Sequence, residues 1–275
     1  MIRMSECTHD CSTCSSKCEK ADFQLAPNVN SNIKNVIAVA SGKGGVGKSL
    51  VTGLLACECA AKGNKTAIMD ADVTGPSVPK AFGIHEKAEG IEGIGIQPAV
   101  SKNGIKVMSI NLILDNEETP VVWRGPVISG VINQFWTEVA WGDVDYMFVD
   151  MPPGTGDVPL TVYQSLPVKG IVVVTTPQDL VTLIVKKAYN MAKMMNVPIL
   201  GVVENMSYVT CPDCGKKLEI FGKGKAEEIA KELGVPVLAT LPIDPKTAEL
   251  VDDGRIDEAD RTGIDEAFEA ISKTL

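Results

Sequence analysis

One glycine-rich loop of the sequence has the residue types that bind phosphate. The run SGKGGVGKS, residues 41–49, follows the apolar strand pattern VIAVA and leads into a helix pattern. Glycines let backbone N–H groups wrap around phosphate oxygens, and the N-terminus of the following helix adds positive potential. Lys48 would neutralise phosphate charge and Ser49 would coordinate Mg²⁺. The loop therefore predicts an ATP site. Its predicted binding residues are Gly42, Lys43, Gly44, Gly45, Val46, Gly47, Lys48, Ser49 and Leu50.

Carboxylates end two of the expected strands. Asp70 ends the strand pattern TAIMD, Asp72 lies two residues later, and Asp150 ends the apolar run YMFVD. Because ligands bind at the carboxyl ends of parallel strands, these side chains should face the phosphates. We predict that Asp72 positions the attacking water, that Asp70 supports the metal from behind its ligands, and that Asp150 holds Mg²⁺ through water. Asp70 and Asp72 could instead simply cap the segment that follows them.

Two further stretches could sense the nucleotide. The run MPPGTGD, residues 151–157, contains Gly154 and Gly156 and is predicted to be a switch that responds to the γ-phosphate, the alternative being a rigid proline turn. Asn205 and the segment LPIDP, residues 241–245, follow later strands and should lie beside the phosphate loop. They would contact the adenine base, or would serve only as turn residues.

Lys43 adds an expectation about assembly. A lysine directly after the first glycine of the loop resembles the deviant Walker A group, which includes MinD, ArsA and the nitrogenase iron protein. In that group this lysine reaches the nucleotide of a facing subunit. The resemblance implies a homodimer with ATP between its subunits; otherwise Lys43 is a solvated loop lysine.

A CxxC pair supplies metal-ligand chemistry. Cys211 and Cys214, in VTCPDCGKK, offer two thiolates, which is half of a tetrahedral metal site. A redox pair would need a helix N-terminus, and no clear helix pattern follows. A zinc knuckle would need four ligands, and His9 and His85 are the only histidines. We favour a third interpretation, in which two chains each donate two thiolates to one [4Fe-4S] cluster, because the same dimer explains Lys43. Zinc at the CxxC pair remains a chemical alternative.

The N-terminal segment holds four more cysteines. Cys7, Cys11, Cys14 and Cys18 could wrap a second [4Fe-4S] cluster or a zinc ion within one chain, or could be unliganded or disulfide-bonded. Cys57 and Cys59 lie in an alanine-rich helix pattern and are expected to be packing residues.

Alternating strand and helix patterns position these groups. The expected strands are 36–40, 66–70, 106–110, 146–150, 170–176, 199–205 and 235–241, and the expected helices are about 48–62, 126–139, 158–166, 179–195, 223–233 and 263–274. Such alternation predicts an α/β P-loop NTPase fold, with a mostly parallel central sheet of about seven or eight strands flanked by helices. Residues 1–32 are predicted to be a Cys-rich segment with a linker, PNVNSN, and residues 33–275 the ATPase domain.

Charge and composition exclude several classes of partner. The 275 residues include 26 basic and 35 acidic side chains, for a net charge of −9. This balance argues against nucleic-acid binding and anionic membrane binding. Neither a signal peptide nor a long apolar span is present in the sequence, so we expect a cytoplasmic protein with reduced thiols.

Four motifs in order carry a specific resemblance. SGKGGVGKS, DADVTGPSVP, VDMPPGTGD and the CPxCG loop are similar to those of the Mrp/ApbC/Nbp family of iron-sulfur cluster carrier ATPases, over roughly residues 33–275. The resemblance implies a slow ATP hydrolase that loads or transfers a [4Fe-4S] cluster to apoproteins. Its cluster ligands would be Cys211 and Cys214, and its ATP site would include Lys43, Lys48, Ser49, Asp72 and Asp150. Eukaryotic-type members have an N-terminal tetracysteine segment with wider gaps.

Two other functions share the expected fold. An ATP-gated electron-transfer protein would draw ligands from separated single cysteines, unlike this loop. A MinD-like or ParA-like dimer switch could bind membranes through a basic C-terminal helix, but this chain ends in the net acidic GIDEAFEAISKTL.

Overall fold

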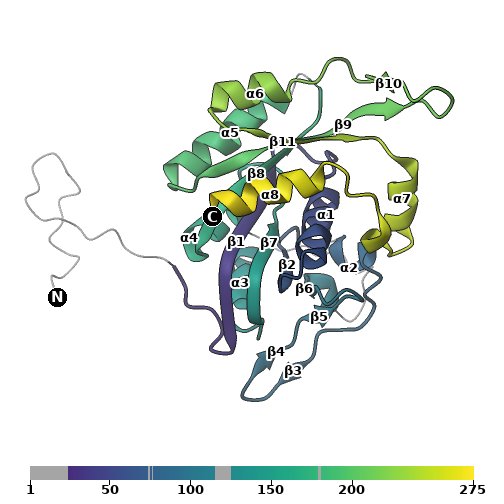
Figure 1. Ribbon diagram of the computed structural model, residues 1–275. Coiled ribbons are helices and arrows are strands. Elements are labelled where there is room, and N and C mark those ends of the chain that lie inside the picture. Colours follow the sequence, from purple (N-terminus) through teal and green to yellow (C-terminus); the bar gives the residue numbers. More distant parts are fainter. Residues whose placement is uncertain (1–23, 74, 76, 115–124, 179–180) are drawn as a thin grey trace, which may run out of the picture.

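The centre of the fold is one large sheet, seen in Figure 1. The computed structural model describes residues 24–73, 75, 77–114, 125–178 and 181–275, with the backbone alone for 181–186. In this part of the chain the sheet has nine strands in the order β10-β9-β8-β1-β7-β2-β6-β5, with β11 paired to β9. The strands are β1 (Ser31–Ser41), β2 (Thr66–Asp70), β5 (Ala99–Val100), β6 (Lys106–Met108), β7 (Gly142–Asp150), β8 (Val168–Thr175), β9 (Ile199–Thr210), β10 (Lys217–Leu218) and β11 (Val237–Pro242).

Parallel pairing brings the predicted site residues to one edge. All seven strands expected from the sequence are present, and they pair in parallel; the short β5 and β10 are antiparallel additions. Asp70 at the end of β2 is in register with Asp150 at the end of β7, and Val39 of β1 is also in register with Asp150. The carboxyl ends of these strands therefore lie beside the loop that follows β1.

Helices cover both faces of the sheet because consecutive residues of a strand point to opposite faces and here both sets are apolar. Ile37 and Val39 of β1 belong to the core beneath α1 (Lys48–Ala61), α2 (Val78–Ala81), α7 (Pro245–Asp252) and α8 (Ile264–Thr274). Val36 and Ala38 belong to the opposite core, beneath α3 (Gly125–Thr137), α4 (Asp157–Ser165), α5 (Val181–Met194) and α6 (Ala226–Leu233). The six expected helices are confirmed. Two short helices with proline in the first turn, α2 and α7, were not expected from the sequence.

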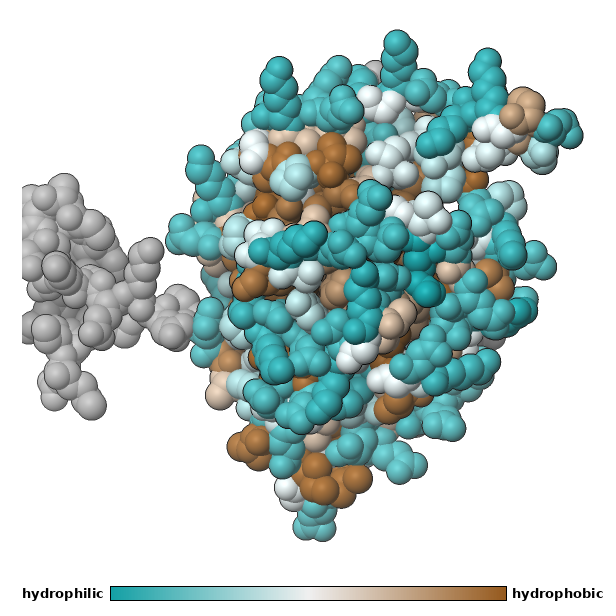
Figure 2. Space-filling view, in the orientation of Figure 1, coloured by the Kyte–Doolittle hydropathy of each residue, from teal (hydrophilic) through white to brown (hydrophobic). Residues whose placement is uncertain are grey.

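A small hairpin of β3 (Gly90–Ile91) and β4 (Gly95–Ile96) projects from the body. Figure 2 shows apolar side chains gathered at this lower tip, where Ile91 and Ile94 are 44% and 42% exposed. Two 3-10 turns, Ile110–Leu112 and Ile256–Glu258, complete the regular structure of the described residues.

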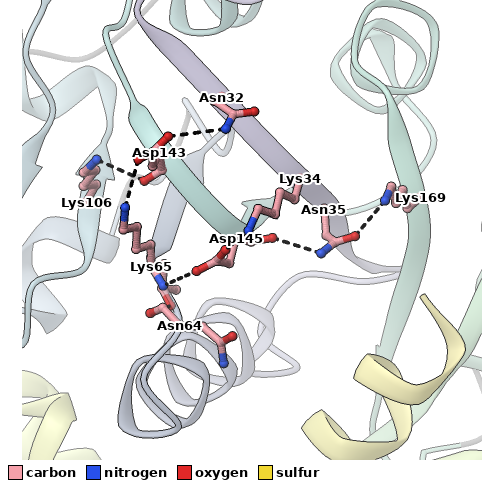
Figure 3. Close-up of polar contacts among 10 residues, drawn as sticks. Asn32, Lys34, Asn35, Asn64, Lys65, Lys106, Asp143, Asp145 and Lys169 are labelled. Atoms are coloured by element: carbon pink, nitrogen blue, oxygen red, sulfur yellow. Dashed lines mark hydrogen bonds and ion pairs between the residues drawn. The ribbon is translucent and has the colours of Figure 1, made fainter.

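The amino ends of the strands carry a network of exposed charges, drawn in Figure 3. Lys34 Nζ lies 2.7 Å from Asp145 Oδ1, and Lys65 Nζ lies 2.9 Å from Asp143 Oδ2. Hydrogen bonds from these lysines lower the pKa of each carboxyl. Exposed ion pairs contribute little to stability, so packing of the sheet, and not this network, fixes the edge opposite the phosphate loop.

Residues 25–31 belong to the folded body, although the sequence places them in a linker. Leu25 N–H donates to Ser165 O at 2.8 Å, and Trp136 Nε1 donates to Leu25 O at 2.8 Å. Asn28, buried in PNVNSN, donates to Glu138 O at 3.2 Å. Residues 1–23 lie outside the described part, so the boundary after residue 32 stays a prediction. Of the helices described, none has the length and apolar character needed to cross a bilayer.

Candidate functional site

The phosphate loop joins β1 to α1 in the conformation that glycine allows. Gly45 and Gly47 have φ values of 77° and 80°, in the left-handed region that other residues rarely adopt. A Cβ on Gly47 would lie 2.1 Å from Asn205 Nδ2, so a side chain there would also collide with β9. Val51 N–H donates to Gly47 O at 3.0 Å and starts α1 directly after the loop. At its glycines the loop thus exposes backbone without side chains, directly before the N-terminus of the helix.

Lys48 lies at the centre of the predicted catalytic residues. Its buried Nζ lies 2.6 Å from Asp150 Oδ1 and 3.8 Å from Asp72 Oδ2. Ser49 Oγ donates to Asp150 Oδ2 at 2.5 Å, and Thr52 Oγ1 donates to Asp150 Oδ1 at 2.9 Å. The structure therefore brings together Lys48, Ser49, Asp72 and Asp150, as predicted. Their hydroxyl and carboxylate oxygens are the donors that Mg²⁺ prefers, so the residues fit this ion.

Asp70 is completely buried behind this group. It accepts hydrogen bonds from Ser109 Oγ at 3.0 Å and from the N–H of Asp72 at 3.2 Å. Burial, reinforced by the nearby charge of Asp150, raises the pKa of Asp70 well above its usual range, although Lys48 opposes the shift. Asp70 therefore lies behind the carboxylates of Asp72 and Asp150, and its role in supporting a metal stays a prediction.

Lys43 and the predicted switch flank the loop. Lys43 is exposed, and its Nζ donates to Gln178 Oε1 at 3.4 Å. Gly154 N–H donates to Ser41 O at 2.9 Å, which ties the switch to the start of the phosphate loop. A Cβ on Gly44 would lie 3.7 Å from Pro153 Cγ, so the two segments are in contact. The segment 151–157 is thus placed to respond to a change in the loop.

The CxxC pair forms the tip of a hairpin between β9 and β10, which extends from the body at the upper right of Figure 1. Cys211 N–H donates to Lys216 O, and Gly215 N–H donates to Cys211 O, both at 2.9 Å. Both thiols are free; Cys211 is half-buried and Cys214 is exposed. Hydrogen bonds from the N–H groups of Cys214 and Asp213 lower the pKa of Cys211. The hairpin therefore favours thiolate, the form that binds metals.

The surroundings of the thiols are those of a contact surface. Leu218, Ile220 and Phe221, just after the CxxC loop, are 44%, 61% and 42% exposed. Lys217 Nζ lies 4.1 Å from the centre of the Tyr208 ring, a cation–π contact that fixes the base of the hairpin. No group of three or more His, Cys, Asp or Glu side chains gathers in a metal-binding arrangement within the described ranges. One chain contributes two thiolates at this place.

The remaining cysteines fall into two sets. Cys57 and Cys59 are buried, and burial raises the pKa of each thiol to about 12, which confirms that they are packing residues. Cys7, Cys11, Cys14 and Cys18 lie outside the described residues, so their metal stays a prediction.

Two expected base contacts have different outcomes. Asn205 lies beside the phosphate loop, where its Nδ2 donates to Val46 O at 3.0 Å. Asp244 caps α7 instead, accepting from the N–H groups of Lys246 and Thr247. Its side chain therefore acts as a helix cap, and contact of the segment 241–245 with the adenine stays a prediction.

Three polar residues of the site were missed from the sequence. Thr52 lies one helical turn after Lys48 and could have been found by that spacing. Ser109 lies within the expected strand 106–110 and directly follows the observed β6, at the edge where ligands bind. Glu204 is a carboxylate inside a buried strand, so it must have hydrogen-bond partners, but the sequence does not identify them.

Replacing Asp70 with asparagine is expected to stabilise the protein free of nucleotide and Mg²⁺ by about 1–2 kcal/mol at pH 8. Because the folded-state pKa of Asp70 lies above its ordinary value of 3.8, its stability contribution is most favourable at low pH and declines as pH rises through the folded pKa. The gain from Asp70→Asn should therefore shrink as pH falls towards 4. Urea unfolding of both proteins between pH 4 and 8 measures it.

Asp143→Asn is the control, because the expected change in stability has the opposite sign. The pKa of Asp143 is lowered, chiefly by Lys65, so this variant should lose stability above pH 4. An Asp70→Asn gain that does not change with pH would contradict the burial of a charged carboxylate.

Known proteins match both the sequence and the fold. The family described as ParA, "NUBPL iron-transfer P-loop NTPase", matches residues 32–275. An iron-sulfur cluster carrier protein of Clostridium perfringens is 50% identical over 234 residues, 82% of each chain. Another from Methanocaldococcus jannaschii is 46% identical over 261 residues, covering 91% of this chain and 90% of that one.

Solved structures agree. A nucleotide-binding protein of Archaeoglobus fulgidus in complex with ADP superposes with a TM-score of 0.74 at 45% identity, covering 82% of this chain and 88% of that chain. MinD of Pyrococcus horikoshii has a TM-score of 0.61 at 17% identity over 88% of this chain and 97% of that one, which shows the fold alone. With a phosphate loop, its carboxylates and the CxxC hairpin all in place, the chain belongs to the NUBPL iron-transfer family of P-loop NTPases.

Proposed function

We propose that the protein is an ATP-hydrolysing carrier or scaffold that binds a [4Fe-4S] cluster between two subunits and transfers it to apo iron-sulfur proteins. The observation that carries the proposal is that β9 contacts the phosphate loop through Asn205 and continues into the free thiols of Cys211 and Cys214. Relatives named iron-sulfur cluster carrier proteins support the identity of the cargo. The protein would act as a homodimer in the cytoplasm and would bind neither nucleic acid nor membranes.

In the proposed hydrolysis, the phosphate loop binds the nucleotide and Lys48 neutralises its β- and γ-phosphates. Asp72, 3.8 Å from Lys48 Nζ, orients the attacking water and accepts its proton. Ser49 and Asp150 would hold Mg²⁺, which when bound stabilises negative charge on the phosphates. Lys43 is exposed, and by exchanging its long hydrogen bond to Gln178 it would reach the nucleotide of the facing subunit.

In the proposed cargo site, each subunit supplies two thiolates to complete four cluster ligands. The backbone N–H groups that favour thiolate at Cys211 prepare one ligand before the cluster arrives. The exposed Leu218, Ile220 and Phe221 would bury against the second subunit and keep water from the cluster. A MinD-like or ParA-like switch would have no use for this hairpin, and that favours the carrier.

Transfer to an acceptor tests the function. The full chain is reconstituted anaerobically with iron and sulfide, desalted, and mixed with an apo [4Fe-4S] enzyme whose activity reports the cluster. We expect activation faster than that given by the same amount of free iron and sulfide. Activation no faster than this control, or a chain that binds only zinc, would contradict the proposal.

A further inference from the structure

Strand β9 is irregular at residues 204–207, here named the β9 bend. Met206 has a φ of 58°, in the left-handed region that favours glycine. Opposite it, the pairing with β11 shifts register, so that Thr240 pairs with Glu204 but Pro242 pairs with Tyr208. A methionine in this conformation is strained, and such strain persists only where the surroundings impose it. The contacts of the bend show what imposes it.

One side of the β9 bend touches the phosphate loop. Asn205 is 2% exposed, and its Nδ2 donates to Val46 O at 3.0 Å. A Cβ on Gly47 would lie 3.9 Å from Met206 Cε, so the Met206 side chain packs against the residue just before Lys48. A movement of the loop on nucleotide binding would therefore displace Asn205 and Met206.

The other side of the β9 bend holds both ends of the cysteine hairpin. The buried Glu204 accepts hydrogen bonds from the N–H groups of Lys225 and Ala226, at 2.8 and 2.9 Å, and from Ser207 Oγ at 2.8 Å. The segment 208–225, which carries both thiols, thus leaves the body at Ser207 and returns at Lys225 to the same place. Cys211 lies only six residues beyond Asn205, about 20 Å along an extended strand.

We propose that the β9 bend is the element that connects the nucleotide site to the cysteine hairpin, because Asn205 and Met206 contact the phosphate loop and Glu204 holds both ends of the hairpin. The inference rests on the proposed carrier function and names its regulation. Met206 is a positioning residue: its strained backbone keeps the bend pressed against Gly47, and a bend packed on both sides moves between discrete arrangements. Glu204 passes the movement to both ends of the hairpin.

The test compares cluster transfer by the full chain in ATP and in ADP. Met206→Gly removes both the strain and the side-chain contact with Gly47, whereas Met206→Leu keeps a left-handed apolar residue of similar size. The transfer rate of wild type and Met206→Leu should differ between the nucleotides by about 2- to 30-fold. For Met206→Gly this ratio should approach one, while its iron content and its ATP hydrolysis stay near wild type. A Met206→Gly ratio equal to that of wild type would overturn the proposal.

A second measurement needs no variant. Hydrogen exchange of the wild-type chain should differ between a non-hydrolysable ATP analogue and ADP at the amides of Cys211, Gly215, Lys225 and Ala226, whose bonds hold the hairpin. Equal exchange at all four in the two nucleotides would also overturn the coupling. Failure of the carrier function is seen separately, as a wild-type chain that loads no cluster or activates no acceptor.

Discussion

Replacing Lys48 with alanine is expected to lower kcat/KM for ATP hydrolysis about 10²- to 10³-fold, the usual cost of removing one group that stabilises transition-state charge. Lys48 is the buried cation among Asp72 and Asp150, and the phosphate loop delivers the nucleotide to it. Release of inorganic phosphate, measured at saturating and limiting MgATP, gives the loss. A variant that keeps more than a tenth of wild-type activity would show that Lys48 does not serve the reaction.

The same substitution also threatens folding, and the structure supplies a control. Without Lys48, the buried Asp150 loses its ion pair at 2.6 Å, which costs about 3–5 kcal/mol when one partner of a buried pair is removed. The double variant Lys48→Ala/Asp150→Asn removes the stranded charge. It should regain most of the stability measured by urea unfolding, which separates the cost of the stranded charge from the loss of hydrolysis in Lys48→Ala. A double variant no more stable than Lys48→Ala would contradict this account of the ion pair.

Replacing Cys211 and Cys214 together with alanine is expected to remove all of the iron that the folded domain binds. A [4Fe-4S] cluster shared by two chains gives about two irons per chain, and its four ligands are the two pairs of thiolates. The experiment uses a chain that begins at Gln24, because the contacts of Leu25 and Asn28 are then kept while the N-terminal cysteines are removed. Iron, sulfide and zinc per chain are measured after anaerobic reconstitution.

Cys57→Ala is the matched control. It also removes a thiol, but a buried one with a raised pKa that no cluster could reach, so about two irons per chain should remain. Iron that persists in the Cys211→Ala/Cys214→Ala variant would refute the hairpin as the cargo site. Zinc in place of iron in the wild-type domain would assign the hairpin to a different metal.

Local sequence pattern predicted most of the fold and several of the residues that meet at the site. Strand and helix periodicity is set by nearby residues, so the seven parallel strands and the position of Lys48 at the start of α1 could be predicted. Parallel strands then had to bring Asp70 and Asp150 to one edge. These inferences needed no knowledge of distant contacts.

The misses share a physical origin, because they depend on partners far away in the chain. Asn28 looks like a linker residue until Glu138 O, 110 residues later, accepts its hydrogen bond. For Asp244 the sequence left two roles open, base contact or turn residue, and only the structure shows that its side chain caps the short helix α7. Nothing local in the run ENMSY predicts a left-handed Met206; the phosphate loop and β11 impose it.

Lys48 is already paired with Asp150, so a nucleotide that binds Lys48 must replace that contact. Lys48 Nζ, Ser49 Oγ and Thr52 Oγ1 all donate to Asp150 already, so the buried charges are mutually satisfied in the protein alone. An arriving nucleotide gains only the difference between two sets of bonds, and its affinity should be weaker than the number of phosphate contacts suggests. The protein can then release spent nucleotide without leaving a bare charge in its core. Such a site favours frequent exchange over long retention.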